Sequence, residues 1–187
     1  MSEAEIIVQC QRNNKDAQRA LFELNFPRLM QMSMRYSKNK DQAKAMLNQG
    51  FGKILSNLSV FQKSETPFET WMKEVFIENA VQFLKAQKHE YYVTTTVRVE
   101  DKKRSGDLFN QIENLDPNDI EEQELLKSIQ ALPPSFRSMF NMCMIDGLDF
   151  KKASEILEVS EDTAKNNLEK ATYQLHQNIR NIQKGFA

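Results

Sequence analysis

Residues 147–175 constrain the fold more than any other part of the chain. Their sequence, GLDFKKASEILEVSEDTAKNNLEKATYQL, is typical of two helices joined by a tight turn. Ser160 can cap the second helix, because its hydroxyl can accept a hydrogen bond from a backbone N–H of the first turn. Behind this cap, apolar residues recur at helical spacing, which predicts one buried face: Ala164, Leu168, Ala171, Leu175 and Ile179.

The opposite face of the second helix carries side chains that can hydrogen-bond to DNA. This is the pattern of a helix-turn-helix whose second helix enters a major groove. The candidate DNA-binding residues are Ser160, Thr163, Lys165, Asn166, Asn167 and Lys170. Glu161, Asp162 and Glu169 lie close by and would repel phosphates. Two such helices also occur in any small helical bundle, so the pattern alone does not decide between DNA recognition and ordinary packing of two helices.

The charge distribution indicates that this region does not bind DNA unaided. Residues 120–187 contain 8 Lys or Arg and 10 Asp or Glu, which gives a net charge of −2. Domains that bind nucleic acid alone are usually more basic. If the protein binds DNA, a partner therefore supplies much of the affinity.

Composition and residue spacing predict an all-α protein without catalytic, metal or cofactor chemistry. Five Gly and five Pro are few for 187 residues, and no long stretch alternates apolar with polar residues. Cys10, Cys143, His89 and His176 are too scattered for a metal site, and no nucleophile–base pair or phosphate-binding loop is evident. The sequence also lacks a signal peptide or a membrane-spanning run, so we expect a cytoplasmic protein with reduced cysteines.

The pattern of apolar residues predicts two helical domains joined by a linker. Residues 1–90 are expected to form a helical domain, with Asp16 capping the second helix and Pro27 kinking it or ending one half. Residues 91–119 are β-prone, then polar, and are interpreted as a linker. Residues 120–187 form the second domain, in which Pro134 opens a helix before the helix-turn-helix.

Three segments together resemble a known family. They are KDAQRALFELNFPRLMQMSMRYSKNKDQAKAMLNQGFGKIL, FETWMKEVFIENAVQFLKAQK and LPPSFRSMFNMCMIDGLDFKKASEILEVSEDTAKNNLEKA. In their order and spacing the chain resembles bacterial sigma factors of the extracytoplasmic-function group. The resemblance covers nearly the whole chain.

This resemblance implies a function in transcription initiation and no enzymatic activity. In that family the N-terminal domain docks on RNA polymerase core and melts the proximal promoter element. The linker threads towards the active site, and the C-terminal domain reads the distal element. The implied partners are RNA polymerase core, promoter DNA and an anti-sigma factor, and we expect a monomer when the protein is free.

The third helix departs from the family where it would face the polymerase. The family pattern Ala-Glu-Asp-Leu-Val-Gln-Glu-x-Phe becomes Ala-Lys-Ala-Met-Leu-Asn-Gln-Gly-Phe at residues 43–51. All three acidic positions are lost, and the candidate polymerase-binding residues are Lys44, Asn48 and Gln49. Gly50 and Gly52 are each expected to weaken the helix by ~1 kcal/mol relative to Ala.

The basic end of the fourth helix is also reduced. Its candidate DNA-binding residues, at or near positions where the family often has Asp and several Arg, are Asn79, Gln82, Lys85 and Lys88. Lys lacks the two-pronged geometry with which Arg binds phosphates. Phe61, Phe68 and Trp71 either stack on an unpaired base or belong to the core.

Two residues of the helix-turn-helix differ from those common in the family. Glu158 stands where the turn often has Gly, and a Glu reaches a left-handed backbone only at a cost. Asn167 stands where Arg is common; it or Asn166 can make a paired contact to adenine. Two hypotheses follow: a divergent extracytoplasmic-function sigma factor, or a degenerate sigma-like protein that regulates transcription by binding proteins.

Overall fold

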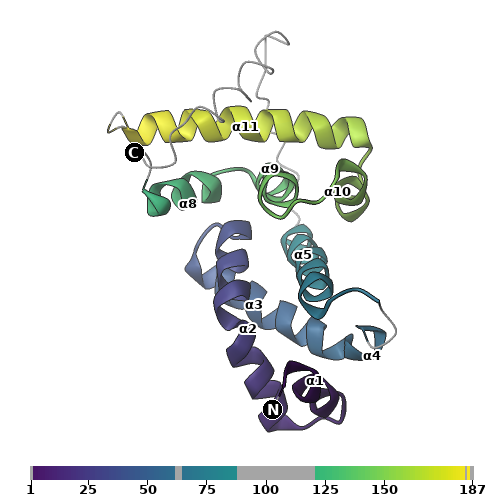
Figure 1. Cartoon of the computed structure of the whole chain (residues 1–187). Helices are drawn as coiled ribbons and strands as arrows, with labels where there is room; N and C mark the ends of the chain where they lie inside the picture. Colours follow the sequence, from purple (N-terminus) through teal and green to yellow (C-terminus); the bar gives the residue numbers. More distant parts are fainter. Residues whose placement is uncertain (1, 62–64, 88–120, 184, 186–187) are drawn as a thin grey trace. The chain divides into compact units, whose positions relative to one another are not determined.

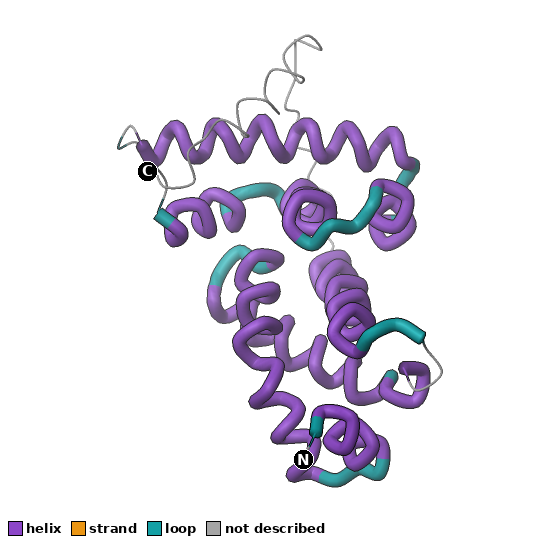
Figure 2. The backbone as a smooth tube through the Cα atoms, viewed as in Figure 1, coloured by secondary structure: helices purple, strands orange, loops and turns teal. Residues whose placement is uncertain are grey.

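The computed structural model describes residues 2–61, 65–87, 121–183 and 185, and the regular structure within these residues is helical (Figures 1 and 2). The chain divides into two compact units, Met1–Phe83 and Leu84–Ala187, with the division inside the last helix of the first unit. The predicted boundaries at residues 90 and 120, and the predicted linker between them, lie outside the described residues. None of the described helices is long and apolar enough to cross a membrane.

The first unit is built from helices α1 to α5. Their bounds are Glu3–Gln11, Lys15–Tyr36, Lys40–Ser56, Leu58–Phe61 and Phe68–Ala86. Ser2 begins α1 with a capping box, in which its hydroxyl accepts from Glu5 N and the Glu5 carboxylate accepts from Ser2 N. Asn39 caps α3 in a similar way, since its side chain accepts from Gln42 N.

Helix α2 begins two residues earlier than predicted. Its cap is Asn14, whose side-chain oxygen accepts a 3.0 Å bond from Ala17 N, so the predicted Asp16 cap is wrong. Asp16 instead lies inside the first turn, where the helix dipole favours its charge. The helix also continues past Pro27 to Tyr36, so Pro27 does not end it.

The core of the first unit is made by one apolar face of each long helix. Helices α1 and α3 both pack on α2. The members that are less than 2 % exposed are Ala17, Leu21, Leu29, Tyr36, Ala43, Met46, Ile54, Leu58, Met72, Phe76, Ile77, Ala80 and Val81. Full burial of one large apolar side chain contributes about 1.5–3 kcal/mol, so this face holds the unit together.

Gly50 lets α3 approach α5 closely. A Cβ atom built on Gly50 would lie 2.5 Å from Cε2 and 2.7 Å from Cδ2 of Phe76. At Gly52, two residues further along, a Cβ would meet nothing within 4 Å. The two glycines therefore differ: Gly50 is required by packing, whereas Gly52 only weakens the helix.

The second unit contains α8 (Glu122–Gln130), α9 (Pro134–Phe140), the π-helical turn η2 (Asn141–Ile145), α10 (Phe150–Leu157) and α11 (Glu161–Gln183). Pro134 is at the start of α9, as predicted. The turn η2 was not predicted. It follows α9 directly, and the chain then turns at Gly147 with a φ of 73°.

The long helix α11 is the central helix of the second unit, because α8, α9 and α10 all pack against it (Figure 1). Arg137 of α9 is only 2 % exposed. Its Nη1 donates to the carbonyl oxygens of Gln130 at 2.6 Å and Leu132 at 3.1 Å. This buried guanidinium therefore holds the corner between α8 and α9.

Candidate nucleic-acid interface

The turn between α10 and α11 has the geometry of a left-handed helix cap. Glu158 ends α10 with φ 58° and ψ 44°, the conformation that the family's usual glycine adopts at little cost. Its N–H donates to Glu155 O at 3.2 Å, and Val159 N donates to Ser154 O at 3.1 Å. These bonds satisfy the last carbonyls of α10 and fix the direction in which α11 starts.

Side-chain caps hold the starts of both helices. The Asp149 carboxylate accepts a 2.7 Å bond from Lys152 N at the start of α10. The Ser160 hydroxyl accepts a 3.2 Å bond from Thr163 N at the start of α11, as predicted from the sequence. The hydroxyls of Ser160 and Thr163 are also 2.9 Å apart and hydrogen-bonded to each other. Two exposed hydroxyl groups thus lie together at the N-terminus of α11.

The buried face of α11 orients its polar face. The predicted apolar stripe is entirely buried, with exposures of 0–4 % for Ala164, Leu168, Ala171, Leu175 and Ile179. Among the candidate residues, Ser160, Thr163, Lys165 and Asn166 are exposed, while Asn167 and Lys170 are half-buried. The first three turns of α11 therefore present donors and acceptors to solvent, and acidic side chains lie among them: Glu161, Asp162 and Glu169.

Two titratable groups of the second unit have shifted pKa values. Burial raises the pKa of the Cys143 thiol to about 11, and the Asp149 carboxylate adds to the shift. Burial also lowers the pKa of the His176 imidazole, and Arg180 lowers it further. Among the described residues, no three His, Cys, Asp or Glu side chains are grouped so as to hold a metal ion.

The remaining candidate residues that the structure describes lie on α3 and α5. Lys44, Asn48 and Gln49 are exposed on α3, and Lys44 Nζ lies 4.0 Å from Asp41 Oδ1. On α5, Gln82 is exposed and Lys85 is in the last turn. The Asn79 side-chain oxygen is buried 3.5 Å from a Cβ built on Gly50, so this residue packs against α3. Lys88 lies outside the described residues.

Comparison with known proteins identifies the second unit. Residues 122–175 match the family model described as "Sigma-70, region 4". This segment runs from the first residue of α8 into α11 and contains the whole helix-turn-helix. Residues 122–175 are similar to sigma-70 region 4, and we call this segment the region 4 domain. The candidate DNA-binding residues on α11 all belong to this region 4 domain.

Two solved structures resemble the chain as a whole. One is the sigma factor RpoE from Bartonella quintana in complex with the anti-sigma factor NepR. It has 15% sequence identity and a TM-score of 0.54, over 89% of this chain and 98% of that chain. The other is CnrH in complex with the cytosolic domain of CnrY, with 13% identity and a TM-score of 0.47 over 92% and 93%. Among curated protein sequences none matches.

These comparisons confirm the predicted resemblance to sigma factors and the all-α fold. The match to region 4 supports the resemblance to sigma factors, and the fold shared with RpoE supports the all-α class. Sequence reasoning missed Arg137, whose buried contacts hold the α8–α9 corner of the region 4 domain. The signal was present, since Arg137 is the only basic residue between Lys127 and Lys151 and lies on a strongly apolar helix.

Proposed function

We propose that the protein is a sigma factor of the extracytoplasmic-function group, which binds RNA polymerase core and directs it to a promoter. The observation that carries the proposal is the region 4 domain with the exposed polar face of α11. Asn166 and Asn167 are of the residue type that pairs with adenine, at ~1–3 kcal/mol of discrimination for a good pair. Lys165 and Lys170 would bind phosphates, and Ser160 and Thr163 would hydrogen-bond at the helix start.

The remaining parts of the chain take the roles implied by the family. Asn79, Gln82, Lys85 and Lys88 would contact the proximal promoter element, and Lys44, Asn48 and Gln49 would face the polymerase. The first domain would end near residue 90, and the second domain would begin near residue 120. The protein would work in the cytoplasm, as a monomer when free. An anti-sigma factor is a further proposed partner, because both solved relatives are described as complexes.

Reconstituted transcription tests the proposal. The chain, mixed with bacterial core RNA polymerase, should form a stable complex and start transcripts at a defined set of promoters. In that complex, Lys165→Ala should weaken binding to all promoters alike and reduce the slope of log affinity against log salt by about 0.9. Asn166→Ala should instead change the preferred sequence. Lys151→Ala, an exposed lysine on α10, is the matched control and should change neither.

A second function is favoured by the altered surface of α3. Lys44, Ala45 and Gln49 are all exposed where the family has carboxylates, so this surface suits a partner other than the usual polymerase site. In this reading the chain is a degenerate sigma-like regulator that binds proteins without starting transcription. A stable polymerase complex with no transcript, or no complex at all, would support it.

Restoring the three carboxylates separates the two functions. The triple variant Lys44→Glu, Ala45→Asp and Gln49→Glu should bind a standard core polymerase at least ~1.4 kcal/mol more tightly, which is tenfold. Equal or weaker binding, with the helical content unchanged by circular dichroism, would mean that α3 faces something else.

A further inference from the structure

The methionine side chains differ sharply in their access to solvent. Among the described residues, Met144 is the one methionine that is largely exposed, at 43 %. The other described methionines are half-buried or buried: Met30, Met32, Met34, Met46, Met72, Met139 and Met142. An oxidant dissolved in water therefore reaches the thioether of Met144 more easily than the others.

The two thiols of the chain are poorly suited to compete for an oxidant. The thiolate, and not the thiol, is the form that attacks. Cys143 is half-buried beside Met144, and burial raises its pKa to about 11, so its sulfur stays protonated at neutral pH. Cys10 is buried, and burial raises its pKa too. A thioether needs no proton loss before it reacts, so Met144 is the accessible reactive sulfur of the described chain.

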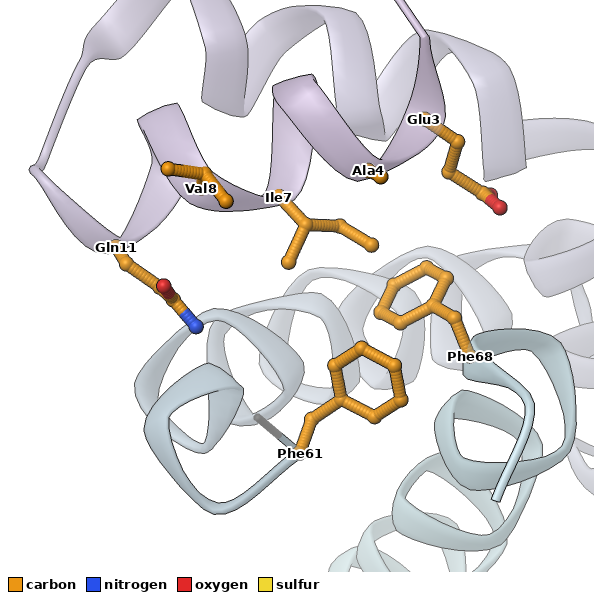
Figure 3. Close-up of a pocket in the computed structure, with 7 residues that line it drawn as sticks. All are labelled: Glu3, Ala4, Ile7, Val8, Gln11, Phe61 and Phe68. Carbon is orange, nitrogen blue, oxygen red and sulfur yellow. The ribbon is translucent and has the colours of Figure 1, made fainter. Parts of the chain in front are cut away.

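The groove along α1 offers no comparable chemistry. It has a volume of about 340 Å³ and is lined by Glu3, Ala4, Ile7, Val8, Gln11, Phe61 and Phe68 (Figure 3). In Figure 3, Ile7 points towards the rings of Phe61 and Phe68, whose centroids lie 5.1 Å apart. Gln11 Nε2 donates to Leu58 O at 3.0 Å. None of the seven lining side chains carries sulfur, so the groove holds no group that a peroxide oxidises readily.

Met144 lies in a turn whose backbone is held firmly. Asp146 N donates to Asn141 O, and Leu148 N donates to Met142 O, both at 2.8 Å. This turn, η2, leads into α10, the first helix of the helix-turn-helix. Because Met144 is 43 % exposed, more than half of its surface is covered by the protein. A polar oxygen added to its sulfur would therefore disturb packing at the entry to α10.

We propose that Met144 is a reversible peroxide-modification site of the second unit. The sulfur lone pair attacks one peroxide oxygen, forming an S–O bond while the O–O bond breaks. The departing oxygen takes the proton of the transferred one and leaves as water, or as an alcohol when the oxidant is an alkyl hydroperoxide. Sulfur loses two electrons and the peroxide gains them. A methionine sulfoxide reductase reverses the change with two thiols, which become a disulfide and release the oxygen as water.

Mass spectrometry of the full chain treated with hydrogen peroxide at pH 7 tests the site. Met139, Met142 and Met144 lie on one tryptic peptide, residues 138–151, so their rates can be compared within the same fragment. Met144 should gain oxygen about tenfold faster than the fully buried Met139 and Met142. It should also react faster than the half-buried Met30. In urea, where the chain is unfolded, the rates should become equal, since the difference comes from the fold.

Thermal unfolding tests the consequence. Oxidation should lower the Tm of the second unit by several degrees, because a sulfoxide is polar where the thioether was apolar. Met144→Leu, which keeps an apolar side chain without sulfur, should have a Tm that peroxide does not change. Met30→Leu is the matched control and should stay sensitive. Methionine sulfoxide reductase with dithiothreitol should restore the Tm of the oxidised chain. The inference does not depend on promoter recognition, because no assay here contains polymerase or DNA.

Three results would overturn the proposal. Equal oxidation rates of Met144 and Met142 in the folded chain would show that exposure does not select the site. Oxidation of Cys143 before Met144 would assign the reactivity to the thiol. Complete conversion of Met144 to its sulfoxide with an unchanged Tm would show that the modification does not affect the fold.

Discussion

Replacing each of the two glycines of α3 by alanine tests the packing of the first unit. The chemical change is the same at both positions, and so is the helical backbone. In an open helix position, Gly→Ala stabilises by about 1 kcal/mol. Gly52 has nothing within 4 Å of a built Cβ and is exposed, so Gly52→Ala should give about this gain.

Gly50→Ala should have the opposite sign. The new Cβ would lie 2.5 Å from Cε2 of Phe76, about 1 Å inside the usual 3.5–4.0 Å separation of carbon atoms. Phe76 is fully buried, so its ring cannot swing into solvent. Overpacking of this kind costs about 1–3 kcal/mol, and we expect the upper end here. Alanine also gains about 1 kcal/mol in helix propensity, so Gly50→Ala should lower the free energy of unfolding by about 2 kcal/mol. The free energies of unfolding of the two variants should therefore differ by about 3 kcal/mol.

Urea unfolding of the full chain measures both effects. Trp71 lies in the first unit, so its fluorescence reports the unfolding of that unit. The double variant Gly50→Ala with Phe76→Leu should lose less stability than the sum of its single changes, because the smaller side chain makes room for the methyl group. If Gly50→Ala proved as stabilising as Gly52→Ala, the close approach of α3 and α5 would be refuted.

Three further predictions concern the second unit. Glu158→Gly should stabilise it by about 1 kcal/mol in thermal unfolding, because it relieves a left-handed backbone, whereas Glu155→Gly inside α10 should destabilise it by a similar amount. Ser160→Ala should cost about 1 kcal/mol through loss of the α11 cap, and Ser160→Gly only a few tenths. Burial lowers the pKa of His176 below its ordinary 6.5, so the unfolded state binds more protons in the window just below pH 6.5. Stability should therefore be full above that pH and fall as the pH is lowered through this window; His176→Leu should flatten this part of the profile, and an unchanged profile would contradict the assignment.

The features predicted correctly from the sequence depend on local periodicity. The stripe from Ala164 to Ile179 follows from helical spacing. The left-handed backbone at Glu158 was implied by the resemblance to a family whose turn often has Gly there. The Ser160 cap needs only its own hydroxyl and the next turn.

The features that were missed depend on contacts between distant segments. Gly50 was expected only to weaken α3, because the ring of Phe76 is 26 positions away in the sequence. Likewise, the groove along α1 joins residues 3–11 to Phe61 and Phe68, and no pattern within α1 indicates it. The missed cap of α2 is a local error, because Asn14 and Asp16 are both good capping residues and the position of the helix start decides between them.

The length of α11 has a mechanical consequence. Its 23 residues span ~34 Å, and the proposed DNA-binding residues lie at or near its start. Its other end is clamped to α8, where Asn178 Nδ2 donates to Ser128 O at 3.1 Å. The start of α11 lies about 25 Å from Asn178, so a tilt of only ~10° about that clamp would move it by ~4 Å, about one base-pair step. Under the proposed function, a small shift of α8 would thus cause a larger movement of the DNA-binding residues at the far end of α11.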